Sequence, residues 1–255
     1  MFFVTTFSEK GYLQYGKNML DSYTKNCNIP IYVYYENFKP EIISENIKYI
    51  DIFDANPDLV NFIKRNKERP VSNFKFDGVR FSYKVFAITH AGMNPSSEWM
   101  FWMDADTLFK EKVNHKQIIK KMQDCASLKA SKNINEYDLA CFARKRTVKR
   151  PPEKCWTECG LVGYNLRNHS TLHFLKIFRS HYVKDKIYKE KQYHDSWIFD
   201  VLIKKLSLTN SINVLNLNPK NFSHPIVQGP MGSLFDHLKG KSRKLRGYSS
   251  EKRKT

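Results

Sequence analysis

Apolar residues follow two alternating patterns along the chain. Short runs of β-branched and aromatic residues alternate with longer segments in which apolar residues recur every three or four positions. This alternation predicts an α/β domain built from strand–helix–strand units. The predicted strands are 2–7, 31–35, 47–53, 99–103, 138–143 and 212–217, and the predicted helices are 12–25, 77–90, 116–129 and 169–184, with further helices starting near 57 and 195.

Other segments lack both patterns and are predicted as loops. Residues 66–76 are charged and contain a proline, and residues 144–152 form a basic loop that ends in a proline pair. Residues from 219 onward are predicted as loop and tail. The chain therefore divides into one domain, 1–238, and a basic tail, 239–255.

The segment 99–103 contains only aromatic residues and methionine, which is typical of a strand buried on both faces. Asp104, Ala105 and Asp106 follow it directly. Side chains two apart in an extended chain point the same way, so both carboxylates are predicted to lie side by side. Such a pair favours a divalent cation that keeps positions open for phosphate oxygens. The alternative is a pair of turn or capping acids, the commoner origin of an isolated Asp-x-Asp.

This stretch resembles the DxD motif of the GT-A nucleotide-sugar glycosyltransferases, in which a hydrophobic strand ends in Asp-x-Asp. The resemblance implies a single α/β/α domain with a central, mostly parallel sheet. It also implies an enzyme that moves a hexose from a nucleotide-sugar, most simply a UDP-sugar, to a glycan, lipid or protein acceptor.

Segments before and after the motif resemble the same family in the same order. The end of the first strand, Thr5, Thr6 and Phe7, would cup the nucleoside. The helix that precedes the acids would lend Arg80 and Lys84 to the nucleotide or its diphosphate. Two solvated charges on an exposed helix face are an equally good reading of that pair.

Two later positions extend the resemblance. Gly160 lies in a glycine-containing segment where the backbone could approach a ligand closely. Asp195 opens a helix, like the late acid of the family that contacts the donor hexose or acts as a base. A simple helix cap is the alternative for Asp195.

The end of the chain resembles the His-x-x-Gly-x-x-Lys segment of the glycogenin-like branch, which suggests retention of the anomeric configuration. His237 would complete the metal site, and Lys241 and Arg243 would hold the diphosphate. Arg243 replaces the usual lysine, and His224 is a competing metal ligand. An imidazole beside two carboxylates favours Mn²⁺, with Mg²⁺ as the second candidate.

Composition narrows the class of protein, its partners and its location. At 255 residues with 41% hydrophobic and 14% aromatic residues, the chain is globular rather than disordered. A net charge of +18 predicts anionic partners, which include phosphorylated ligands, nucleic acid and an acidic membrane face. Five cysteines without a disulfide pattern and no apolar run of membrane-spanning length predict a cytoplasmic protein, compatible with peripheral membrane contact.

Three rival interpretations compete with a glycosyltransferase. A basic nucleic-acid-binding protein would use the charged segments, but no recognition motif accompanies them, so no nucleic-acid partner is expected. A nucleotidyltransferase could use the same Asp-x-Asp, but usually carries a glycine-rich or basic motif near its first strand. A zinc finger would use Cys155, Cys159, His169 and His173, but nine residues separate the pairs instead of about twelve.

Overall fold

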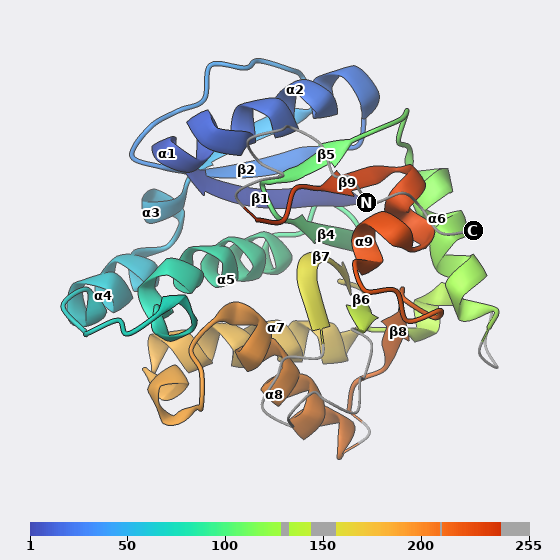
Figure 1. Ribbon diagram of the computed structural model, residues 1–255. Coiled ribbons are helices and arrows are strands. Elements are labelled where there is room, and N and C mark those ends of the chain that lie inside the picture. Colours follow the sequence, from blue (N-terminus) through green and yellow to red (C-terminus); the bar gives the residue numbers. More distant parts are fainter. Residues whose placement is uncertain (129–132, 144–156, 210, 241–255) are drawn as a thin grey trace.

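A seven-stranded sheet in the order β3-β2-β1-β4-β7-β6-β8 forms the centre of the molecule (Figure 1). The computed structural model describes residues 1–128, 133–143, 157–209 and 211–240. Only β7 runs antiparallel to its neighbours in this sheet, which confirms the mostly parallel α/β architecture. The strands are β1 (Phe2–Ser8), β2 (Ile31–Glu36), β3 (Ile47–Asp51), β4 (Trp99–Met103), β6 (Leu139–Ala143), β7 (Thr157–Asn165) and β8 (Val214–Asn216).

Helices cover both faces of the sheet (Figure 1). Residues of α2 and α6 belong to one hydrophobic cluster, and residues of α4, α5, α7 and α8 belong to the other. The helices are α1 (Glu9–Gly11), α2 (Lys17–Asn26), α3 (Ile52–Ala55), α4 (Pro57–Asn66), α5 (Gly78–Met93), α6 (His115–Ala126), α7 (His169–Val183), α8 (Asp195–Ser207) and α9 (Pro225–Gln228). Shorter turns are a π-helical turn at Tyr12–Gly16 and 3₁₀ turns at Phe74–Phe76, Ile134–Glu136, Lys186–Lys189 and Pro230–Ser233.

The strand β4 confirms the prediction of burial on both faces. Trp99, Phe101 and Met103 pack in the first cluster, and Met100 and Trp102 pack in the second. None of the five is more than 3% exposed. Because β4 lies in the middle of the sheet, both faces need apolar side chains, and the continuous apolar run follows from that position.

The prediction that residues after 219 are loop and tail is wrong for the described part of that segment. It forms α9, a 3₁₀ turn and the strand β9 (Phe235–His237), which pairs antiparallel with β5 (Thr107–Phe109). These elements are too short to show a period, and β9 obtains its register from a distant strand. The Leu238 amide also donates to the Asp106 carbonyl at 2.8 Å, which ties the segment to the Asp-x-Asp turn.

The strand predicted at 47–53 ends early, at Asp51, because this carboxylate caps α3. It accepts hydrogen bonds from the amides of Phe53 at 2.8 Å and Asp54 at 3.2 Å. No helix among the described residues is long and apolar enough to cross a bilayer. The predicted basic loop at 144–152 and most of the predicted tail lie outside the described residues.

Candidate active site

The two acids of the Asp-x-Asp motif lie in a tight turn that leaves β4. The Asp104 amide still pairs with the Gly160 carbonyl of β7 at 2.8 Å, and the Thr107 amide then donates to the Asp104 carbonyl at 3.0 Å. The two carboxylates are thus brought together by a turn, and the predicted strand alternation is wrong in this detail. The turn lies at the carboxyl end of a parallel strand, where open α/β sheets bind ligands.

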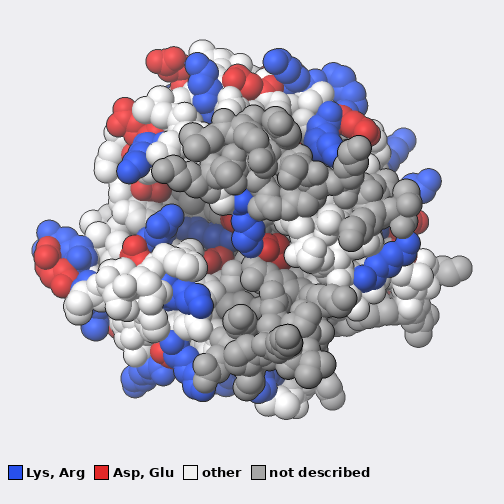
Figure 2. Space-filling model, in the orientation of Figure 1, with Lys and Arg blue, Asp and Glu red and all other residues white. Residues whose placement is uncertain are grey.

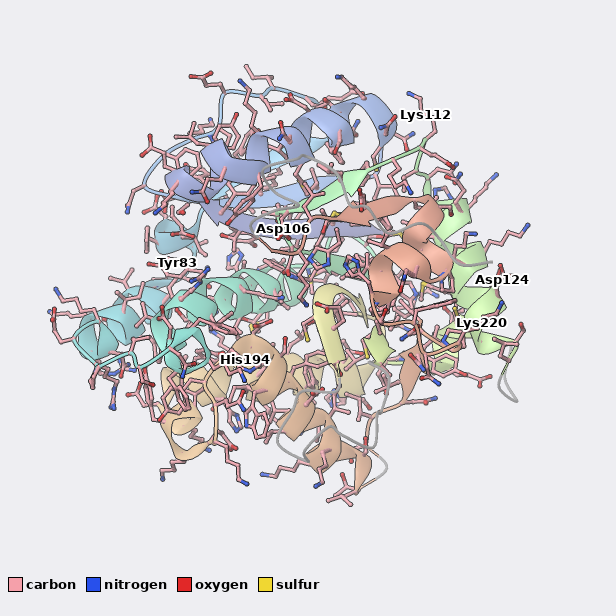
Figure 3. All side chains as sticks on the ribbon, viewed as in Figure 1. Tyr83, Asp106, Lys112, Asp124, His194 and Lys220 are labelled. Carbon is pink, nitrogen blue, oxygen red and sulfur yellow. The ribbon has the colours of Figure 1, made fainter. Side chains whose placement is uncertain are left out.

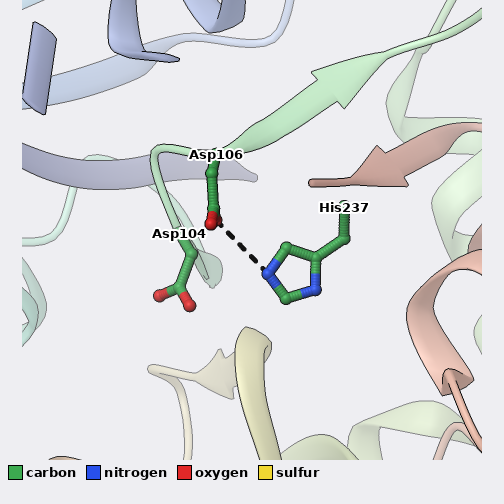
Figure 4. A group of neighbouring side chains, drawn as sticks. All are labelled: Asp104, Asp106 and His237. Carbon is green, nitrogen blue, oxygen red and sulfur yellow. Dashed lines mark ion pairs between the residues drawn. The ribbon is translucent and has the colours of Figure 1, made fainter. Parts of the chain in front are cut away.

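His237, the last residue of β9, lies beside these acids (Figure 4). Its Nε2 is 3.3 Å from Asp106 Oδ1, and its side chain is only 2% exposed. Within the described residues, Asp104, Asp106 and His237 are the only group of metal-ligating side chains, with ligand atoms within 4.8 Å of one another. Two carboxylate oxygens and one imidazole nitrogen suit a divalent ion such as Mn²⁺.

Charge around His237 favours a cation at this position. Burial alone would lower the pKa of His237, but the hydrogen bond and charge of Asp106 outweigh it and raise the pKa. The competing ligand His224 lies next to it, with ring centroids 5.6 Å apart, but is outside the three-residue group. Gly160 leaves room for the imidazole, since a Cβ there would lie 2.8 Å from His237 Cε1.

Lys84 joins the acidic turn to α8. Its Nζ lies 2.9 Å from Asp104 Oδ1 and 2.8 Å from Asp195 Oδ2, and it donates to the Cys159 carbonyl at 2.7 Å. Burial opposes the charge on Lys84, but the carboxylates of Asp104 and Asp195 prevail and raise its pKa. With its side chain 13% exposed, Lys84 is not the solvated surface charge of the alternative interpretation. Arg80, one turn earlier, is exposed.

Asp195 does not cap its helix. The N-cap of α8 is His194, whose Nδ1 accepts from the Trp197 amide, and Asp195 occupies the first turn. Its carboxylate is 7% exposed and turned toward Lys84. The candidate catalytic acid is therefore part of an Asp–Lys–Asp cluster, in which Asp195 and Lys84 are largely buried and Asp104 is half-buried, and the cluster holds it next to the acidic turn.

A cleft of two cavities surrounds this cluster. The larger, about 630 Å³, is lined by the end of β1, α5 and the Asp-x-Asp turn, and the smaller, about 360 Å³, by β7, the start of α8 and residues after β9. They share Phe81, Lys84 and Asp104. Figure 2 shows this face hollowed, with basic and acidic side chains around the hollow, and Figure 3 labels Asp106 of the larger cavity and His194 of the smaller.

The predicted nucleotide-contacting residues divide as follows. The larger cavity is lined by seven of them, Thr6, Phe7, Arg80, Lys84, Asp104, Ala105 and Asp106. The smaller cavity is lined by Gly160. Thr5 lines neither, because its side chain is fully buried within β1. Lys241 and Arg243 lie outside the described residues.

Known structures share this arrangement of strands and helices. No protein-family model and no curated protein matches the chain. The apo form of mouse xyloside xylosyltransferase 1 matches over 85% of this chain and 84% of its own, with 11% identity and a TM-score of 0.50. The galactosyltransferase LgtC in complex with donor and acceptor sugar analogs matches over 94% of this chain and 87% of its own, with 13% identity and a TM-score of 0.50. The chain has the GT-A fold.

The described residues of the segment proposed for a zinc finger belong to the central sheet and to α7. Cys159 is buried in the central strand β7, and His169 and His173 lie on α7, away from the three-residue group. No cysteine or histidine pair of this segment forms a metal-ligating group among the described residues, and Cys155 lies outside them.

The structure adds site residues that the sequence analysis did not single out. Glu36 ends β2 and lines the larger cavity, and Glu158 lines the smaller, with Lys239 Nζ 2.6 Å from its Oε2. A sequence signal for Glu36 exists, since it follows a predicted strand as directly as Asp104 follows β4. Burial raises the pKa of Glu36 to about 7.

Replacing Glu36 by Gln is expected to stabilise the protein above neutral pH. Since the pKa of Glu36 is raised in the folded state, ionisation costs folding free energy as pH rises from about 4.5 through 7. Glu36→Gln should therefore raise the free energy of unfolding by about 1–2 kcal/mol at pH 8, which corresponds to a Tm about 2–8 °C higher. At pH 4.5 it should change Tm little. Scanning calorimetry across pH measures the difference. An exposed control, Glu9→Gln, should show none, and an unchanged Tm at pH 8 for Glu36→Gln would contradict the assignment.

Proposed function

We propose that the protein is a metal-dependent glycosyltransferase that moves a hexose from a nucleotide-sugar, in the simplest case a UDP-sugar, to a sugar-containing acceptor. The observation that carries the proposal is the convergence of Asp104, Asp106 and His237 beside two cavities whose linings share Lys84 and Asp104. The GT-A fold supports the same reaction class, since both structural neighbours are glycosyltransferases by name.

Asp104, Asp106 and His237 would hold the ion, for which Mn²⁺ is the better candidate and Mg²⁺ the second. A bound divalent ion would neutralise the diphosphate that leaves when the glycosidic bond breaks. The larger cavity is lined by the ends of β1 and β2 and by the turn after β4, which supports a proposed nucleoside position beside Thr6 and Phe7. Arg80 and Lys84 add positive charge along it, and Lys241 and Arg243 are proposed to add more.

Asp195 would contact the transferred sugar. Its ion pair with Lys84 holds the carboxylate at the boundary between the cavities, where it can accept hydrogen bonds from sugar hydroxyls. A carboxylate fixed by a buried ammonium suits orientation of the sugar better than proton transfer, although either role uses the same position. Lys84 would thus set the geometry of both Asp104 and Asp195.

A panel of nucleotide-sugars tests this function. Purified protein is incubated with UDP-glucose, UDP-galactose, UDP-xylose and GDP-mannose, with Mn²⁺ or with EDTA, and nucleoside diphosphate release is measured. We expect release from at least one UDP-sugar with Mn²⁺ and none with EDTA. No release from any donor would refute the proposal, and pyrophosphate release from nucleoside triphosphates would indicate a nucleotidyltransferase instead.

As part of the same proposal, the enzyme is cytoplasmic, and the net charge of +18 supports its peripheral contact with an anionic membrane. Sedimentation with phosphatidylserine vesicles should remove the protein from solution at low salt and release it at high salt, since exposed charges are screened. Zwitterionic vesicles are the control. Failure to sediment with anionic vesicles at low salt would remove the membrane from the proposal.

A further inference from the structure

We propose that the smaller cavity binds the acceptor as a neutral pyranose sugar stacked on the ring of Phe74; this inference rests on the proposed function. The cavity lies on the β7 side of β4, whereas the proposed nucleoside cavity lies on the β1 and β2 side. Lys84 and Asp104 belong to both. A molecule in the smaller cavity therefore meets the transferred sugar from the side opposite the nucleotide.

Phe74 lines this cavity with 59% of its surface exposed. Its position is fixed by its neighbours in the 3₁₀ turn. Asn73 Oδ1 accepts from the Lys75 amide at 3.0 Å, and the Tyr193 amide donates to the Lys75 carbonyl at 2.8 Å. Phe76 packs edge-on against the Tyr193 ring at 5.3 Å. The turn is thus anchored to the segment before α8, and one of its two aromatic rings stays at the cavity wall.

Other residues of the cavity lining are polar. The buried carboxylates of Glu158 and Asp195 line the cavity, and each is held by a lysine, at 2.6 Å from Lys239 and 2.8 Å from Lys84. His194 Nδ1 accepts from the Trp197 amide, so Nε2 carries the proton and donates to Gln192 Oε1 at 2.8 Å. The cavity therefore combines one exposed aromatic face with fixed hydrogen-bonding groups.

A pyranose matches both the aromatic and the polar part of this lining. One face of the ring presents C–H groups that pack on an aromatic side chain, and its hydroxyls donate to carboxylates, which accept more than one hydrogen bond each. An acyl chain would bury the two carboxylates against apolar atoms, which is unfavourable. The cavity lining contains three lysines and three acids, so it offers an anionic acceptor no net positive charge. With acyl chains and anionic acceptors disfavoured, a neutral sugar is the class of acceptor that fits this cavity.

The test measures sugar binding directly. Saturation-transfer NMR with protein, Mn²⁺ and UDP is run against methyl β-glucoside, methyl β-galactoside, methyl β-xyloside, lactose and maltose. We expect at least one to bind, with Kd raised about three- to tenfold by Phe74→Ala and largely preserved by Phe74→Trp. The matched control is Val71→Ala, since Val71 lies in the same loop, is 51% exposed and lines a different cavity. Val71→Ala should leave Kd unchanged.

Calorimetric titration of the protein with UDP in the presence of Mn²⁺ distinguishes failure of the acceptor assignment from failure of the proposed function. We expect UDP affinity to be equal in wild type, Phe74→Ala and Val71→Ala. If UDP binds but no sugar in the panel does, or if Phe74→Ala binds sugar as tightly as wild type, the acceptor assignment is overturned alone. If the wild type binds no UDP with Mn²⁺ and hydrolyses no donor, the proposed function fails and the acceptor assignment with it.

Discussion

Asp106→Ala is expected to lower the rate of metal-dependent donor hydrolysis at least about a hundredfold. Asp106 is one of only three ligand side chains in the described group, and its carboxylate also contacts His237 at 3.3 Å. Removing it leaves the ion with one carboxylate and an imidazole that has lost its partner. Donor hydrolysis as a function of Mn²⁺ concentration measures both the residual rate and the loss of metal affinity.

The matched control for this change is Asp124→Ala, an exposed acid on α6 outside the cleft (Figure 3). It should retain wild-type hydrolysis and wild-type Mn²⁺ dependence. A thermal melt of both variants verifies that each is folded before activity is compared. Full activity of a folded Asp106→Ala variant would show that Asp106 does not hold the ion.

Lys84→Met is expected to destabilise the fold by about 3–5 kcal/mol, because it leaves the buried carboxylate of Asp195 without its ammonium. The Asp104 carboxylate, with 34% of its side chain exposed, contributes less because water solvates it in part. Asp104 and Asp195 both lie within 2.9 Å of Lys84 Nζ, and the Lys84 and Asp195 side chains are 13% and 7% exposed. For a chain of this size the loss corresponds to a Tm about 6–20 °C lower. Thermal melts in the absence of metal measure it.

Two further variants test whether the unpaired carboxylates cause the loss of Tm in Lys84→Met. Adding Asp195→Asn to Lys84→Met removes one of the unpaired charges and should recover a substantial part of the lost Tm, as a double-mutant cycle requires for groups in contact. Lys120→Met, an exposed change on α6, should leave Tm unchanged. A Lys84→Met protein that melts within 2 °C of wild type would mean that solvent already compensates these carboxylates.

The fold was predictable where the local sequence of one segment is enough to identify its secondary structure and burial. The apolar run of β4 and the acids after it require nothing beyond local sequence, and they correctly place the motif at the end of a central strand. The strand β9 carries no such signal, since three residues cannot show a period and its pairing with β5 is set by tertiary contact. His237 could therefore be named from its resemblance to the family, but not from its place in a sheet.

The role of Lys84 could not be predicted from the sequence. The helix containing it was predictable, but whether its side chain is solvated depends on the element opposite. That element is the first turn of α8, which brings Asp195 within 2.8 Å of the lysine ammonium. Sequence periodicity describes the faces of one helix and carries no information about which charge a distant helix will present. The same reasoning applies to Glu158 and Lys239, which meet across the cleft.

The pairing of β5 with β9 has a consequence for biosynthesis. The acids at 104 and 106 leave the ribosome long before residue 237, and β5 has no partner until β9 follows. A nascent chain therefore carries two adjacent carboxylates without the imidazole that completes their set. A polypeptide halted before residue 235 would carry the motif without the complete set of three side chains, so metal binding by all three would have to follow the synthesis of β9.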